Sequence, residues 1–134
     1  MDTPTAFAAI ALAAVSWDGV LSSAGARSLR HALDYRQPFR QFDEVRMVEL
    51  MDSLLAGLRS KGSQHRMVEA AAVLSPQQRA TAYAAATEIM RSDGPLQPDE
   101  RNILSNLADV LELDEALTLA INQVMDVLHA DLEA

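Results

Sequence analysis

The sequence SDGPLQPDE at residues 92–100 decides the fold that we expect, because its Asp-Gly-x-Leu pattern occurs twice in the chain. The earlier copy, WDGVL, occupies residues 17–21, and each copy separates an alanine-rich apolar segment from an amphipathic one. Asp-Gly is a turn dipeptide, since glycine accepts positive φ angles and aspartate can hydrogen-bond to nearby backbone. The repeat therefore predicts two related helical hairpins, each built around an Asp-Gly turn, with a middle helical section between them.

Capping signals divide the chain into about seven helices. The clearest signal is at residues 75–78, where an N-cap serine is followed by proline and, at the third position, by glutamine. Thr3 is expected to cap the first helix in the same way, because Pro4 follows it. We expect helices over residues 5–16, 23–35, 44–60, 64–73 and 76–91, and two more that begin near residues 98 and 115. The second helix has Ser22 or Ser23 as its expected cap, and the third has Asp43. Strand-like alternation is absent, so we expect an all-α fold and a single domain over residues 1–134.

Apolar residues at three- and four-residue steps predict the faces that these helices bury. The first helix carries such a series at Phe7, Ile10, Ala14 and Trp17. The stripe of helix 44–60 consists of Val45, Val48, Met51, Leu55 and Leu58. The last helix, with Asp114 as its expected cap, repeats the pattern at Leu117, Ile121, Val124 and Leu128.

The charge and the composition exclude several classes of protein. The formal net charge of −8 argues against a nucleic-acid binder, which needs a basic surface. Cysteine is absent, so disulfides and thiolate metal sites are excluded. The apolar run at residues 6–15 is too short to span a bilayer, and no basic residue precedes it, as a signal peptide would require. We therefore expect a soluble, cytoplasmic protein.

The charge is also unevenly distributed along the chain. Eight of the 11 basic residues lie between Arg27 and Arg66, whereas residues 102–134 contain seven acids and no Lys or Arg. This pattern favours an ordinary solvated surface of uneven composition over a dedicated binding patch, although an acidic surface is also compatible with a basic partner.

The second Asp-Gly turn matches only half of a calcium-binding EF-hand loop. With Asp93 at position 5 of the loop, Gly94 stands at position 6, Leu96 at position 8 and Glu100 at position 12, as the motif requires. Positions 1 and 3 then fall on residues 89 and 91, which are isoleucine and arginine. We therefore do not expect a complete calcium loop.

A smaller set of carboxylates remains, and it allows two interpretations. Asp93 and Glu100 flank one turn, Asp99 lies beside them, and Asp18 belongs to the related turn. If the two hairpins pack so that their turns meet, oxygen ligands from these residues, with water, would suit a hard divalent ion. In the alternative interpretation, the aspartates only stabilise the turns and Glu100 only favours the start of a helix.

No arrangement of residues points to an enzyme. His31, His65 and His129 lie on three different predicted helices, so no two of them have the spacing of a helical metal motif. Neither a nucleophile elbow nor a phosphate-binding loop is present. We therefore expect a protein without catalytic activity.

The two turns and the helices around them resemble the TerB-like family, named after the tellurite-resistance protein TerB. The resemblance rests on AAVSWDGVL at residues 13–21 and MRSDGPLQPDERNIL at residues 90–104, and it extends over most of the chain. It implies an all-α fold with internal pseudo-symmetry and a non-enzymatic role in stress or metal-linked systems. It also implies Asp18, Asp93 and Glu100 as metal ligands. The chain departs from the family pattern at Gly25, where the first repeat would carry its acidic residue.

Two hypotheses about function follow. In the first, a metal-responsive protein binds a divalent cation through Asp18, Asp93, Glu100 and Asp99. In the second, the turns are purely structural, and a helix face docks an as yet unidentified protein partner.

Overall fold

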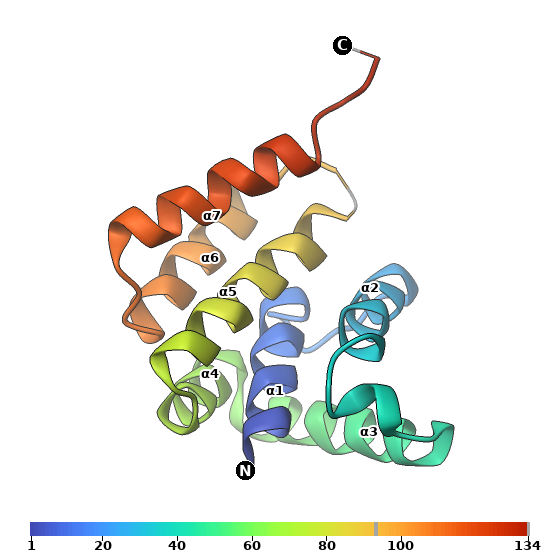
Figure 1. The fold of residues 1–134 in the computed structure, drawn as a ribbon. Coiled ribbons are helices and arrows are strands. Elements are labelled where there is room, and N and C mark those ends of the chain that lie inside the picture. Colours follow the sequence, from blue (N-terminus) through green and yellow to red (C-terminus); the bar gives the residue numbers. More distant parts are fainter. Residues whose placement is uncertain (93, 134) are drawn as a thin grey trace.

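The computed structural model describes residues 1–92 and 94–133, and over these residues the chain contains seven α-helices and no strand. The expected all-α fold is thus confirmed (Figure 1). The helices are α1 (Thr3–Val15), α2 (Ser23–Asp34), α3 (Glu44–Lys61), α4 (Ser63–Val73), α5 (Pro76–Arg91), α6 (Pro98–Val110) and α7 (Glu115–Leu128), with a single 3-10 turn, η1 (Phe39–Gln41), between α2 and α3. Among the described helices, none is long and apolar enough to cross a membrane.

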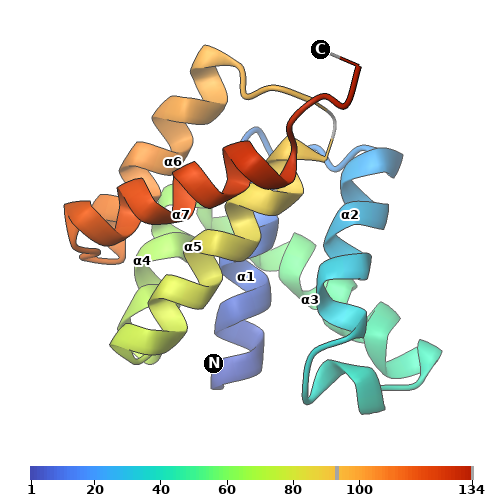
Figure 2. The same ribbon diagram turned by 45° about the horizontal axis from the view of Figure 1, so that its top comes forward.

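Helix α1 forms the centre of the molecule. Every residue from Ala6 to Ala14 is buried, as expected of a helix that is apolar on all sides. The other helices surround α1, with α4 and α5 in the most extensive contact with it (Figures 1 and 2). Alanine accounts for most of this segment, and small side chains allow neighbouring helix axes to approach closely. The alanine-rich segment before the first turn therefore organises the core.

Polar side chains tie the surrounding helices together. The Arg79 guanidinium donates from Nε to the carbonyl oxygens of Ala71 and Leu74, at 3.0 and 3.1 Å, and from Nη1 to that of Leu111 at 3.3 Å. These carbonyls lie at the ends of α4 and α6, where no further turn of helix satisfies them. On the other side of α1, Arg30 of α2 binds both carboxylate oxygens of Glu44 at the start of α3, which lowers the pKa of Glu44.

Most of the predicted helix starts are confirmed, but the predicted cap of α1 is wrong. Asp114 stands at the N-cap of α7 as expected, without a side-chain hydrogen bond to the helix. The Ser75–Gln78 capping box is present, and the side chains of Ser22 and Asp43 cap α2 and α3. Helix α1, in contrast, is capped by Asp2, whose Oδ1 accepts a hydrogen bond from the Thr5 amide at 2.9 Å. Aspartate is a better N-cap than threonine, so the cap lies one residue earlier than expected, the helix begins at Thr3, and Pro4 takes the second helical position.

Several residues that were expected to be buried are exposed. Trp17 lies beyond the end of α1 and is half in solvent, and Val45 and Val48 face outward at the start of α3. The buried residues of α3 are instead Met47, Leu54 and Leu58. The first part of α3 projects past α1, beside the 3-10 turn (Figure 1), so less of its surface is covered there than a continuous stripe would imply. The apolar series of α7 is also mostly exposed.

Candidate functional site

The first Asp-Gly turn is a well-anchored structural turn. Oδ1 of Asp18 accepts a hydrogen bond from the Val20 amide at 3.0 Å, and Gly19 has a φ of 82°, which favours glycine. The turn is fixed from outside by the Ser63 hydroxyl, which donates to the Trp17 carbonyl at 2.8 Å. Asp18 therefore stabilises the turn, as one of the two interpretations expects. Only Oδ1 of its carboxylate takes part in this hydrogen bond.

The second turn leads into α6 through a capping box. Oε1 of Glu100 accepts a hydrogen bond from the Gln97 amide at 2.9 Å, as expected of a glutamate at the third position of a helix. Asp99 is exposed next to it. Asp93, the remaining predicted ligand, lies outside the residues that the structure describes.

The first Asp-Gly turn and the start of α6 line a common surface depression. A hollow of about 310 Å³ is lined by Asp18, by Asp99 and Glu100, and by apolar residues at the ends of α1 and α5. Gly25 lies on the same hollow, seven residues after Asp18, just as Glu100 lies seven residues after Asp93. The fold thus brings residues from the two copies of the pattern to one place.

The donor chemistry of this hollow suits a hard cation, but the described ligands are too few. Asp18, Asp99 and Glu100 offer carboxylate oxygens, which Ca²⁺ and Mg²⁺ prefer, and each capping carboxylate keeps one oxygen for another partner. Within residues 1–92 and 94–133, however, no group of three or more His, Asp or Glu side chains is close enough to hold a metal ion. The described part of the hollow is therefore at most an incomplete metal site.

The outward face of α7 exposes an unusual number of large apolar side chains. Leu119, Val124 and Val127 are 57%, 61% and 79% exposed. With the exception of Gln123, all the residues that follow this side of the helix are apolar: Ala116, Leu117, Leu119, Ala120, Val124, Val127 and Leu128. We call these seven residues the α7 apolar face. Contiguous exposed apolar surfaces of this kind mark interaction sites in soluble proteins.

The inward side of α7 is held by polar contacts as much as by apolar ones. Asn122 donates from Nδ2 to the Tyr83 hydroxyl at 2.9 Å, and Asp126 forms an ion pair with Arg91. Both partners belong to α5, and Met125 is the only buried residue that the structure describes in α7. Helix α7 lies along the outside of the bundle in both views (Figures 1 and 2). It therefore turns a partly polar side to the protein and its most apolar side to solvent.

Comparison with known protein families shows to which family the chain belongs. The family model described as "Tellurite resistance protein TerB" matches residues 4–123, which cover both turns, helices α2 to α6, and all of α1 except Thr3. The chain belongs to the TerB family. No curated protein sequence and no solved structure matched it. The resemblance inferred from the two Asp-Gly turns is thus confirmed for this member of the TerB family.

The α7 apolar face was not recognised as a surface from the sequence. The three- and four-residue repeat of Leu117, Ile121, Val124 and Leu128 indicates only that α7 is amphipathic. A signal was nevertheless present, because Leu119 and Val127 lie outside that repeat and widen the apolar part beyond one stripe. When a helix carries more apolar residues than its contact with the bundle can bury, we expect a second partner to cover the remaining ones.

Proposed function

We propose that the chain acts by binding and not by catalysis, as a cytoplasmic docking module whose α7 apolar face binds a basic amphipathic helix of a partner protein. The observation that carries the proposal is the solvent exposure of Leu119, Val124 and Val127 along one side of α7. Helix-to-helix docking uses apolar anchors at three- and four-residue steps, which this face supplies over 14 residues, or about 21 Å. The family description names tellurite resistance, and we propose a tellurite-resistance or stress system as the setting.

Charge supports a basic partner. Residues 102–134 contain seven acids and no Lys or Arg. Exposed acids stand at both ends of α7, with Asp114 and Glu115 before the apolar face and Asp131 and Glu133 after it. A helix with an apolar stripe and flanking lysines would complement both features, and opposite charges would accelerate its association. A second copy of this chain would instead bring two acidic surfaces together.

A designed peptide tests this proposal. A peptide of about 18 leucine and lysine residues, arranged as an amphipathic helix, is expected to bind in fluorescence anisotropy with saturation. The double variant Leu119→Glu/Val127→Glu is expected to weaken that binding by at least about tenfold, because it places two charges in the apolar contact. Since both positions are exposed, thermal stability should hardly change.

Two controls separate docking from simple charge attraction. Val45→Glu adds a carboxylate at an exposed valine of α3 and should leave binding unchanged. A scrambled peptide of the same composition keeps the charge but loses the apolar stripe, and it should bind far more weakly. Equal binding of the scrambled peptide, or unchanged binding by the double variant, would contradict the proposal. A dimer that the double variant dissociates in light scattering would assign the face to a second copy instead.

Divalent cation binding is the second candidate function. The observation that favours it is the shared hollow, where Asp18 of one turn lies with Asp99 and Glu100 beside the other. A cation there would use the carboxylate oxygens that do not cap the backbone, with Asp93 as the further predicted ligand. The α7 proposal does not depend on it.

Melting of chelator-stripped protein tests the cation. Addition of Mg²⁺, Ca²⁺, Mn²⁺ or Zn²⁺ is expected to raise the melting temperature with saturation for one of these ions, since a ligand of the folded state stabilises it by mass action. The increase should vanish in Asp18→Asn and in Asp93→Asn, and persist in Asp52→Asn, an exposed carboxylate of α3. The same increase in all three variants, or none in the wild type, would rule out a site at the turns.

A further inference from the structure

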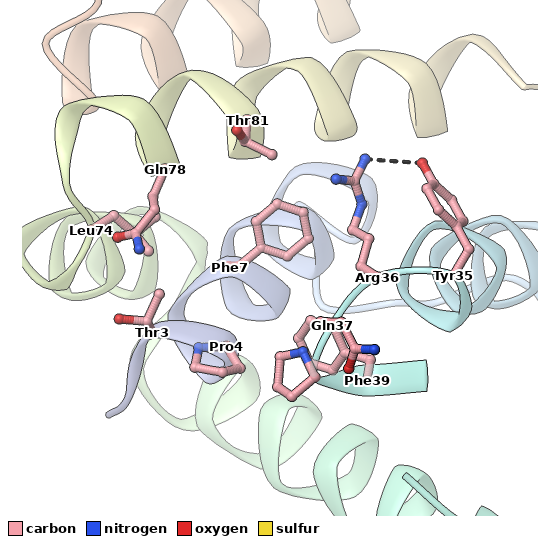
Figure 3. Close-up of a pocket in the computed structure, with 11 residues that line it drawn as sticks. Thr3, Pro4, Phe7, Tyr35, Arg36, Gln37, Phe39, Leu74, Gln78 and Thr81 are labelled. Carbon is pink, nitrogen blue, oxygen red and sulfur yellow. Dashed lines mark hydrogen bonds between the residues drawn. The ribbon is translucent and has the colours of Figure 1, made fainter. Parts of the chain in front are cut away.

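A second hollow, away from the Asp-Gly turns and from the outward face of α7, has the properties of a small-molecule site. It is a cleft of about 480 Å³ between the first turns of α1, the segment that follows α2, and the start of α5 (Figure 3). Its volume lies within the range of about 300–1,000 Å³ that is usual for ligand pockets. Phe7 lies in the middle of the cleft, with Arg36 at one end and Gln78 and Leu74 at the other (Figure 3).

Arg36 is the only charged residue that lines this cleft among the described residues. Its guanidinium carbon lies 5.4 Å from the centre of the Phe7 ring and 4.9 Å from that of Tyr35. Its Nε donates to the Ala32 carbonyl at 3.0 Å, and its Nη2 donates to the Tyr35 hydroxyl at 2.9 Å. The two aromatic rings and these two hydrogen bonds hold the guanidinium in one position, and its other terminal nitrogen points to the Phe7 side of the cleft (Figure 3).

Arg36 differs from the other half-buried arginines in having no anionic partner. Each of the other four forms an ion pair with a described carboxylate: Arg30, Arg66, Arg79 and Arg91. No described Asp or Glu pairs with Arg36. A half-buried cation has lost part of its hydration shell. At Arg36 only neutral groups replace the lost water, and no opposite charge compensates for it. A bound anion would supply the missing charge-assisted hydrogen bond.

The rest of the lining determines what kind of anion fits. Phe7, Pro4 and Leu74 are apolar, and the remaining polar groups of the cleft carry no charge. One cation beside an apolar floor suits a ligand with a single negative charge and an apolar body, and it does not suit a polyphosphate. The net charge of −8 opposes anions only weakly here, because charges farther away than about 8 Å are largely screened at physiological salt.

We propose that this cleft binds a small organic carboxylate, with the carboxylate on Arg36 and an aromatic or aliphatic body over Phe7. The carboxylate accepts hydrogen bonds from the free terminal nitrogen of the guanidinium. The apolar body displaces water from the Phe7 ring and from the neighbouring proline and leucine. The site acts independently of the docking of a helix on α7.

Nuclear magnetic resonance titration of the labelled protein tests this proposal with defined probes. The probes are benzoate, phenylacetate, indole-3-acetate and octanoate, each paired with its neutral amide. At least one carboxylate is expected to shift the backbone amide signals of Phe7, Arg36 and Gln78 with saturation. The neutral amide of the same probe should bind at least about tenfold more weakly, because the charge-assisted hydrogen bond is lost.

Variants of this cleft make the test specific. Arg36→Met keeps much of the apolar stem and removes the charge, so carboxylate binding should fall by at least about tenfold. Gln78→Glu should also weaken carboxylate binding by at least about tenfold, because the added carboxylate repels an anion in the cleft. Arg36 is unchanged in this variant, and glutamate can still complete the capping box with Ser75. Gln77→Glu is the matched control, since this neighbouring exposed residue does not line the cleft.

The outcomes are distinct. Loss of carboxylate binding in Gln78→Glu but not in Gln77→Glu supports the site even if Arg36→Met folds poorly. The proposal is overturned if none of the four carboxylates produces saturable shifts at the cleft. It is also overturned if the amides bind as tightly as the acids, or if Gln78→Glu binds as well as the control.

Discussion

Replacement of Leu107 by alanine is expected to lower the free energy of unfolding by about 2–5 kcal/mol, the range measured for buried leucines in protein cores. Leu107 is fully buried in α6, and this helix contacts α1, α4 and α5. The shortened side chain removes apolar surface from the core and leaves a cavity that three neighbouring helices can fill only partly. Urea unfolding followed by circular dichroism measures the change, and an unchanged slope against urea concentration would show that the native fold is retained.

Leu119→Ala in α7 is the matched control for this prediction. The same atoms are removed from a side chain that is 57% exposed, so the free energy of unfolding should change by less than about 0.5 kcal/mol. A loss as large as that of Leu107→Ala would mean that Leu119 is covered in solution. If that loss disappeared on dilution, the cover would be a second copy of the chain.

Local signals in the sequence were sufficient to predict most of the fold. Capping residues act over three or four positions, so Ser75, Asp43 and Ser22 mark the starts of their helices without knowledge of the rest of the structure. The repeated Asp-Gly turn also indicated the family, and the family model confirms it. The error at Thr3 has the same local origin, because Asp2 and Thr3 are both capable of capping and the stronger residue prevailed.

The orientation of whole helices was not predictable in the same way. Periodicity shows that a helix has an apolar side, but the neighbours that cover it are set by the tertiary arrangement. Val45 and Val48 were assigned to the core of α3, yet they lie where that helix extends past its neighbours. In α7 the contacts of Asn122 and Asp126 with α5 determine the rotation of the helix, and polar residues give no periodic apolar signal.

Of the two candidate sites, one had a local signal in the sequence and the other depends only on the tertiary arrangement. The cation hypothesis rested on an internal repeat and on the condition that the two turns pack together. In the structure, Asp18 of the first turn lines one hollow with Asp99 and Glu100 at the start of α6. Asp93 lies outside the described residues, and the cation itself stays a prediction. The cleft at Arg36 had no signal in the sequence, because its lining comes from three separated segments and an unpaired arginine is recognisable only when its surroundings are known.

Replacement of Ala13 by leucine is expected to lower the free energy of unfolding by about 1–3 kcal/mol or more through overpacking. Ala13 has no exposed surface and belongs to α1, which contacts α4 and α5 over much of its length. The three added carbon atoms must displace a helix or force strained side-chain conformations. The same urea measurement checks the prediction, and a weaker near-ultraviolet signal is expected as packing around the buried Tyr83 is disturbed.

Ala56→Leu provides the control, because Ala56 is exposed on α3 and alanine and leucine have similar helix propensities. A difference between the two variants therefore reports packing around α1 and not helix formation. If Ala13→Leu were as stable as the control, the core around α1 would contain space for a larger side chain. The alanine-rich composition would then not be a requirement of close helix packing, and the central role assigned to α1 would have to rest on its burial alone.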